Sequence, residues 1–209
     1  MLPVASVVLN AVVMPLCIIA WLQLALVGSK DPKMLAARGV GSLKYFTVLS
    51  NMFSALVSAA YLVAGLCFGA HADAWMLSLK LMATTSVMLT FLTVVVLLNP
   101  IYGWRRMYAS GNLWLHLVLP LIALVDCCLY ASIETLPWQS SLLGMVPTIV
   151  YGVFYLRNVV VHGAEEDGKV YDFYGFLRWG KDKIPFVTVG MLLASWLIAL
   201  GVYGLSALI

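Results

Sequence analysis

A polar face in the second apolar segment of the chain has residue types that could perform acyl transfer. Thr47, Asn51, Ser54 and Ser58 are spaced so that they fall on one side of a helix. A threonine hydroxyl is a weak nucleophile and needs a general base within hydrogen-bond reach. His116, in the fourth apolar segment, could accept that proton as a neutral imidazole. The two residues therefore predict attack of a threonine oxygen on an ester carbonyl.

The same polar residues also have a purely structural explanation. Serine and threonine bond back to a preceding carbonyl in membrane helices and allow close helix packing, and a single histidine can join two helices. The amide of Asn51 cannot be satisfied on its own helix, so we expect it to find a partner on another one. That amide could also orient a substrate carbonyl or stabilise an oxyanion. From the residues alone, both interpretations stay open.

The composition indicates that these residues belong to an integral membrane protein. Apolar residues make up 63% of the 209-residue chain and charged residues only 10%, and the mean hydropathy is +1.00, far from the values of soluble globular proteins. A helix needs about 20 apolar residues to cross the hydrocarbon core. We therefore predict an all-α, polytopic fold, a single domain over 1–209, with six transmembrane helices near 4–28, 45–69, 75–98, 112–131, 140–161 and 185–208. The first is expected to be a retained helix and not a signal peptide.

Basic residues predict the orientation, because cytoplasmic loops retain lysine and arginine. They gather between segments one and two, between three and four, and at or after the end of five: Lys30, Lys33, Arg38, Lys44, Arg105, Arg106, Arg157, Lys169, Arg178, Lys181 and Lys183. Both termini are therefore expected outside. Thr47 and His116 then lie about one turn inside the cytoplasmic boundary, at matching depth. The net charge of +3 suits anionic lipid headgroups and requires no nucleic acid as a partner.

Three charged residues fall inside predicted spans: Lys80, Asp126 and, near the end of the fifth span, Arg157. Lys80 lies one or two turns into the third span, and we expect it to snorkel outward. Asp126 follows His116 by ten residues, which places it about 15 Å deeper along the helix. It is therefore a poor partner for His116, and we expect it to form an interhelical bond instead.

The end of the fifth segment could bind the carboxylate of a fatty acid. Tyr155 and Asn158 share a helix face with His162, and Arg157 beside them offers a bidentate fork. Arg157 could equally be a positively charged anchor at the membrane surface. The stretch VYDFYGFLRWGKDK, which contains Tyr171, mixes aromatic and basic residues as interfacial segments do. It is either an anchor or a flap over a lipid portal.

Several of these motifs together resemble a known family. They are Lys44-Tyr-Phe-Thr47, His116 followed by an apolar pair and Leu119-Pro120, and Tyr155 followed sixteen residues later by Tyr171. In order and spacing they are similar to the androgen-induced-gene family, which includes the androgen-dependent tissue-factor-pathway-inhibitor-regulating proteins and bacterial Pr6Pr-type relatives. The sequence departs from the family's YPF motif, because Asp172 follows Tyr171.

The resemblance implies a multipass threonine hydrolase that cleaves fatty acid esters of hydroxy fatty acids. Thr47 would be the nucleophile and His116 the base, with Asn51, Tyr155, Arg157, Asn158 and Tyr171 as our candidates for substrate contacts. The expected location is a bacterial inner or plasma membrane, and the expected partners are membrane lipids and a lipid ester. The sequence leaves the oligomeric state open.

Two other functions remain possible. The first is a transporter or lipid-binding protein without hydrolase activity, for which Asp126 and Pro147 are the only hints. The second is a haem or metal protein that uses His116 and His162, although such sites need more ligands than two histidines. The chain has no GxSxG, HExxH or phosphate-binding glycine loop. We therefore predict no cofactor and no metal.

Overall fold

The computed structural model describes residues 2–27, 39–166 and 169–209. Within them the chain forms eight helices: α1 (Val4–Val27), α2 (Phe46–Phe68), α3 (Ala74–Leu92), α4 (Asn99–Tyr102), α5 (Trp104–Met107), α6 (Leu119–Tyr130), α7 (Val146–His162) and α8 (Ile184–Leu208). Two short strands, β1 (Glu165–Glu166) and β2 (Lys169–Val170), pair antiparallel. The predicted all-α class is confirmed, with this small hairpin as its only strand pair among the described residues.

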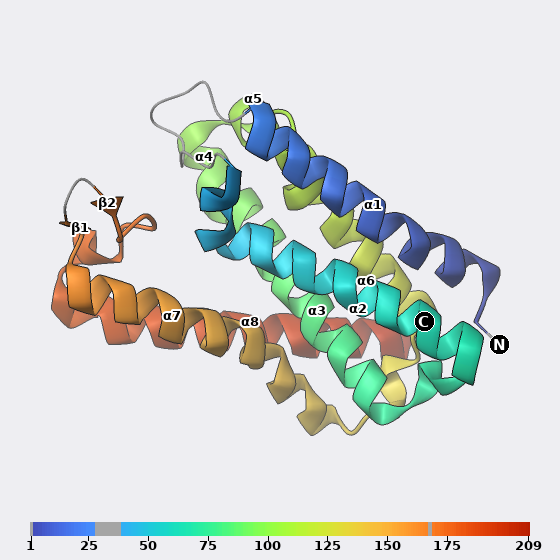
Figure 1. The fold of residues 1–209 in the computed structure, drawn as a ribbon. Helices are drawn as coiled ribbons and strands as arrows, with labels where there is room; N and C mark the ends of the chain where they lie inside the picture. The colour runs from blue at the N-terminus through green and yellow to red at the C-terminus, as the bar shows by residue number, and fades with distance from the viewer. Residues whose placement is uncertain (1, 28–38, 167–168) are drawn as a thin grey trace.

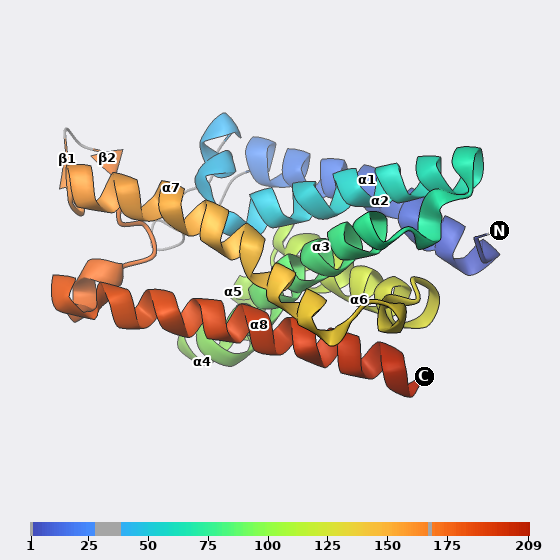
Figure 2. The same ribbon diagram turned by 90° about the horizontal axis from the view of Figure 1, so that it is seen from below.

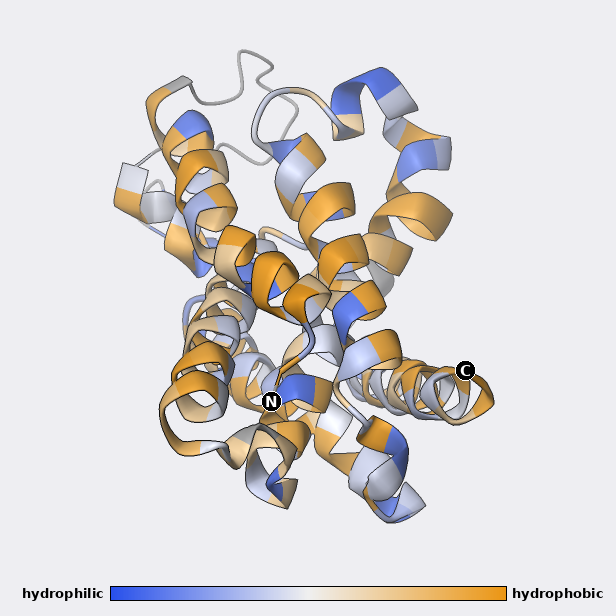
Figure 3. Ribbon diagram, turned by 90° about the vertical axis from the view of Figure 1, so that its right-hand side faces the viewer, coloured by the Kyte–Doolittle hydropathy of each residue, from blue (hydrophilic) through white to orange (hydrophobic). Residues whose placement is uncertain are grey.

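Five helical stretches of the described residues are long and apolar enough to cross a membrane. They are Val4–Leu26, Phe46–Phe68, Ala74–Tyr102, Trp138–His162 and Lys181–Leu208. The stretch expected as the fourth of six spans is a shorter apolar helix, Trp114–Tyr130. Apolar residues predominate along most of the ribbon (Figure 3). Such helices satisfy their own backbone hydrogen bonds, which a hydrocarbon solvent demands.

The long helices form a bundle in which α3 is central. Helix α1 packs against α2, α2 packs against α3, and α3 also contacts α6 and α8 (Figures 1 and 2). Both termini lie at one end of the bundle (Figure 1). We call the other end the basic end, because Lys44, Arg105, Arg106 and Lys169 lie in its connections. Lys30, Lys33 and Arg38, which helped to predict the orientation, lie outside the described residues.

Helices α7 and α8 approach each other about midway along α8 and diverge toward the basic end (Figure 2). Their contact includes a hydrogen bond of 2.8 Å between the hydroxyls of Thr148 and Ser195. Close approach is possible there because Gly144 has no side chain: an added Cβ would lie 2.5 Å from the Cβ of Ala199. We call the segment between β2 and α8 the last loop; its Tyr174 contacts Phe46 at the start of α2.

Two π-helical turns interrupt the bundle's regular helices. One covers Thr93–Leu98 and runs into α4, and the other covers Trp114–Val118 and runs into α6. Each is followed within two residues by a proline, Pro100 or Pro120. A proline has no N–H to donate, so it disturbs the hydrogen bonds of the preceding turn. Because π turns are rare and recur at functional sites, the second is of interest: it contains His116.

Candidate functional site

The first two turns of α2 carry the polar residues nearest to the basic end. Thr47 lies in the first turn, just after Phe46, and its side chain is half-buried. Asn51 lies one turn further and is only 1% exposed. Its Nδ2 donates to the Thr47 carbonyl at 2.8 Å and to the Leu115 carbonyl at 3.1 Å. The predicted interhelical partner of Asn51 is therefore confirmed and adjoins His116, but the expectation that its own helix offers the amide no partner was wrong, because the Thr47 carbonyl also accepts from it.

His116 is held in one orientation by the backbone of the preceding loop. The imidazole is 8% exposed, and its Nδ1 lies 3.1 Å from the carbonyl oxygen of Met107 at the end of α5. A carbonyl can only accept a hydrogen bond, so this contact assigns the hydrogen to Nδ1. In the neutral ring Nε2 then carries the lone pair. This is the tautomer in which a histidine can act as a general base.

The structure brings the turn of Thr47 next to the turn of His116 through Asn51. The two side chains themselves are not bonded: in the part of the chain that the structure describes, no hydrogen bond joins the Thr47 hydroxyl to the His116 imidazole. Catalytic hydrogen bonds are often long in the absence of substrate and tighten when it binds. The arrangement thus places a threonine hydroxyl and a histidine imidazole, the groups that the sequence predicts as nucleophile and base, on adjacent turns.

The candidate substrate residues of α7 do not converge on one point. Tyr155 is 2% exposed and donates to a carboxylate oxygen of Asp172, whereas Arg157 is exposed on another side of the helix. Asn158 donates to the Phe154 carbonyl in its own helix at 2.8 Å. The Tyr171 ring stacks on His162 with centroids 4.2 Å apart. Tyr155 therefore contacts the last loop, Tyr171 stacks on the end of α7, and Arg157 stands apart from them.

Asp172 organises the last loop. One carboxylate oxygen accepts from Tyr155 and from the Phe176 N–H at 2.8 Å, and the other accepts from the Leu177 N–H at 2.8 Å. The loop then reaches α2, because the Phe46 N–H donates to the Tyr174 hydroxyl at 2.9 Å. That N–H belongs to the first turn of a helix, where backbone donors lack partners within the helix. The loop therefore docks directly beside Thr47.

A hollow of about 410 Å³ lies at the basic end under this loop. It is lined by Tyr102, Ala164, Asp172, Phe173, Tyr174, Gly175 and Leu177. The ammonium of Lys44 lies 5.0 Å from the centre of the Phe173 ring and 5.3 Å from that of Tyr45. The lining of the hollow thus combines three aromatic side chains with one carboxylate, that of Asp172.

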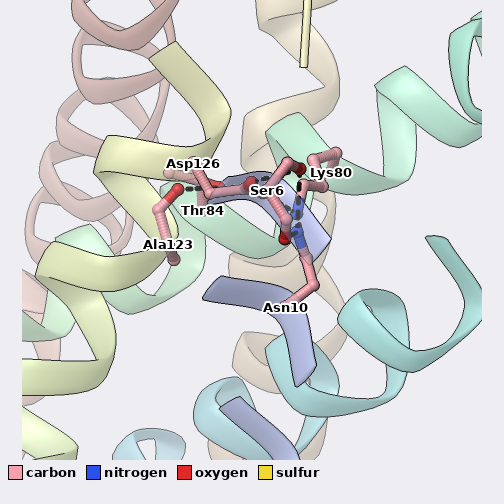
Figure 4. Close-up of polar contacts among 6 residues, drawn as sticks. All are labelled: Ser6, Asn10, Lys80, Thr84, Ala123 and Asp126. Carbon is pink, nitrogen blue, oxygen red and sulfur yellow. Dashed lines mark hydrogen bonds and ion pairs between the residues drawn. The ribbon is translucent and has the colours of Figure 1, made fainter. Parts of the chain in front are cut away.

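A second polar cluster lies at the opposite end of the bundle (Figure 4). Lys80 of α3 forms an ion pair with Asp126 of α6 and donates to the amide oxygen of Asn10 in α1. Ser6 donates to the other oxygen of Asp126 at 2.6 Å. The ammonium also lies 4.4 Å from the centre of the Tyr61 ring in α2. One ion pair therefore joins side chains from four helices.

The expected snorkelling of Lys80 was wrong. The residue is 4% exposed, because Asp126 and Asn10 offer it partners inside the bundle. The predicted interhelical bond of Asp126 is confirmed. Sequence reasoning missed Ser6 and Asn10, whose four-residue spacing in the first span was the available signal. It also missed the contact of His116 with the backbone carbonyl of Met107. Every residue type has such a carbonyl, so the sequence carries no signal for this contact.

The site contains groups for proton transfer and nucleophilic attack. Among the described residues, no three His, Cys, Asp or Glu side chains come together in a way that could hold a metal ion. The three cysteines that are buried, Cys17, Cys127 and Cys128, are free thiols. In comparisons with known proteins, no family model, no curated protein and no solved structure matches this chain.

Proposed function

We propose that the protein is an intramembrane lipid-ester hydrolase that uses Thr47 as nucleophile and His116 as general base. The observation that carries this proposal is the fixed His116 ring. Its Nδ1 is occupied by the Met107 carbonyl at 3.1 Å, which leaves Nε2 to accept a proton. The Asn51 amide holds the turn of Thr47 against the same π turn.

The reaction would proceed in two acyl-transfer steps. Thr47 Oγ1 attacks the ester carbonyl carbon while its proton passes to His116 Nε2. The tetrahedral intermediate collapses, and the leaving alkoxide takes that proton and departs as an alcohol. Water then attacks the acyl-threonine ester, His116 takes the proton from the water, and collapse releases a carboxylic acid and returns the proton to Thr47. In the first step the acyl group passes from the ester to Thr47, and in the second it passes from Thr47 to water. His116 carries one proton in each step.

The position of the site suits a lipid substrate. Six crossings with both termini outside would place Thr47 and His116 near the cytoplasmic face, where water and lipid headgroups meet. The hollow under the last loop adjoins Phe46, the residue before Thr47, through Tyr174. Its aromatic walls favour an apolar chain. A fatty acid ester of a hydroxy fatty acid, as in the androgen-induced-gene family that the motifs resemble, fits this environment.

Hydrolysis of a lipid-ester panel by purified protein in detergent tests the proposal. We expect Thr47→Ala and His116→Ala to lose about 10²-fold or more of the wild-type rate, and Thr47→Ser to keep part of it. Thr188→Ala is the matched control for Thr47→Ala, because the Thr188 hydroxyl donates to the Ile184 carbonyl within its own helix, α8, which carries neither Thr47 nor His116. Wild-type protein that is folded but cleaves no ester would refute the proposal.

One observation favours a second candidate, a transporter. Ionisable side chains inside a membrane bundle mark substrate or ion pathways in many transporters, and Lys80 and Asp126 form such a pair. Uptake or efflux measured in proteoliposomes separates the two candidates. A transporter would lose transport in a Lys80→Met, Asp126→Leu double variant and keep it in Thr47→Ala, whereas the hydrolase would show the opposite pattern for ester cleavage.

A further inference from the structure

The π turn around His116 leaves one backbone carbonyl without a donor in its own helix. The Leu119 N–H donates to the Trp114 carbonyl, five residues back, and not to the Leu115 carbonyl, four residues back. At the π spacing, the next possible donor to Leu115 is residue 120, which is Pro120 and has no N–H. The carbonyl of Leu115 therefore has no partner at either helical spacing.

The side chain of Asn51 supplies the missing donor. Its Nδ2 lies 3.1 Å from the Leu115 oxygen and 2.8 Å from the Thr47 oxygen. Both partners are carbonyls, which only accept, so the NH₂ group must face them and the amide cannot be turned over. Both amide hydrogens are thereby used. This geometry leaves Asn51 without a free donor for an oxyanion, and it gives the residue a different role.

We propose that Asn51 is a positioning residue that sets the separation between the proposed nucleophile and base. It bonds the backbone of Thr47 on one side and the residue before His116 on the other. Ser50 helps on the α2 side, because its hydroxyl donates to the same Thr47 carbonyl at 3.1 Å. This inference rests on the proposed hydrolase function. It adds the reason why Pro120 lies four residues after His116: the proline keeps the Leu115 carbonyl open to Asn51.

Asn51→Leu keeps the approximate size of the side chain and removes both donors. We expect kcat for ester hydrolysis to fall about 10²-fold, because a shift of about 1 Å between reacting groups has an effect of that order. KM should change little, since Asn51 does not contact the hollow in which the chain of the substrate would lie. Ser54→Ala is the matched control: it removes a buried polar group one turn further along α2 and touches neither catalytic turn.

A second variant separates positioning from mere stability. Pro120→Ala returns an N–H to residue 120, which can donate to the Leu115 carbonyl or its neighbour in the same helix. In Asn51→Leu, Pro120→Ala protein, the thermal unfolding midpoint should recover toward that of Pro120→Ala alone, whereas kcat should stay low, because the link to Thr47 is still missing. Recovery of kcat together with stability would assign Asn51 a structural role only and overturn the inference.

The outcomes distinguish this inference from the function on which it rests. If wild-type protein hydrolyses esters and Thr47→Ala does not, but Asn51→Leu keeps the wild-type kcat, the hydrolase stands and the positioning role is refuted. If folded wild-type protein cleaves no ester at all, the hydrolase proposal fails and the positioning role fails with it. A low kcat with unchanged KM in Asn51→Leu, not rescued by Pro120→Ala, is the result that supports Asn51 as a positioning residue.

Discussion

At the scale of single residues, burial decides what each polar group can do. Lys80 and Asp126 are charged residues in an apolar bundle, and each is acceptable there because the other, with Asn10 and Ser6, replaces water. Removal of one partner leaves the other charge buried without compensation. Replacement of both by apolar side chains of similar size can instead be neutral. We can therefore predict how replacing one or both of these residues changes the stability of the protein, whatever its function is.

Lys80→Met should destabilise the protein by roughly 3–5 kcal/mol, because Asp126 is left buried and unpaired. Adding Asp126→Leu should restore most of that loss. The measurement is the unfolding midpoint in detergent, with Lys181→Met as control, since Lys181 is an exposed lysine near the start of α8. A Lys80→Met protein as stable as the wild type would show that the ion pair contributes nothing to the fold.

At the scale of elements, one carboxylate and two prolines shape the basic end. Asp172 ties the last loop together through Tyr155 and two backbone N–H groups, and Tyr174 then fixes the loop to the first turn of α2. Pro100 and Pro120 follow the two π turns. In both cases a local change of hydrogen bonding in one element determines how a neighbouring element can dock.

Asp172→Ala should release the last loop, because three hydrogen bonds lose their acceptor together. We expect trypsin to cut within 169–183 several-fold faster in the variant than in the wild type. Asp182→Ala is the control, since Asp182 is an exposed carboxylate of the same loop and pairs only with its neighbour Lys183 at 3.1 Å. Equal cleavage rates for wild type and Asp172→Ala would mean that this carboxylate does not hold the loop.

At the scale of the whole molecule, both termini lie at one end and the basic connections at the other (Figure 1). If the long axis of the bundle runs across the membrane, this arrangement corresponds to an even number of crossings. Five stretches have spanning length, and Trp114–Tyr130 is shorter. If that shorter helix also crosses, as proposed, the two polar clusters lie near opposite faces of the membrane, with Thr47 and His116 on the side of the positive charge.

Labelling with a membrane-impermeant maleimide in intact cells tests this topology. In a Cys67→Ala background, Gln139→Cys should react, because the connection before α7 would face outside, and Ala109→Cys should react only after the cells are opened. Both positions are exposed, and the remaining cysteines are buried. The reverse labelling pattern would invert the orientation. Labelling of both positions from the same side would show that Trp114–Tyr130 does not cross.

The sequence by itself determined the class of the protein and the positions of its long helices, because hydropathy and helix length act locally along the chain. It also indicated that Asn51 needs an interhelical partner and that Thr47 and His116 lie near one end of their helices. Only the tertiary structure decided which groups meet. Lys80 turned inward because Asp126 and Asn10 are there to receive it, and Asn51 found the Leu115 carbonyl because Pro120 cannot donate to it. Such pairings depend on packing between segments far apart in the chain, which the pattern within any one segment does not contain.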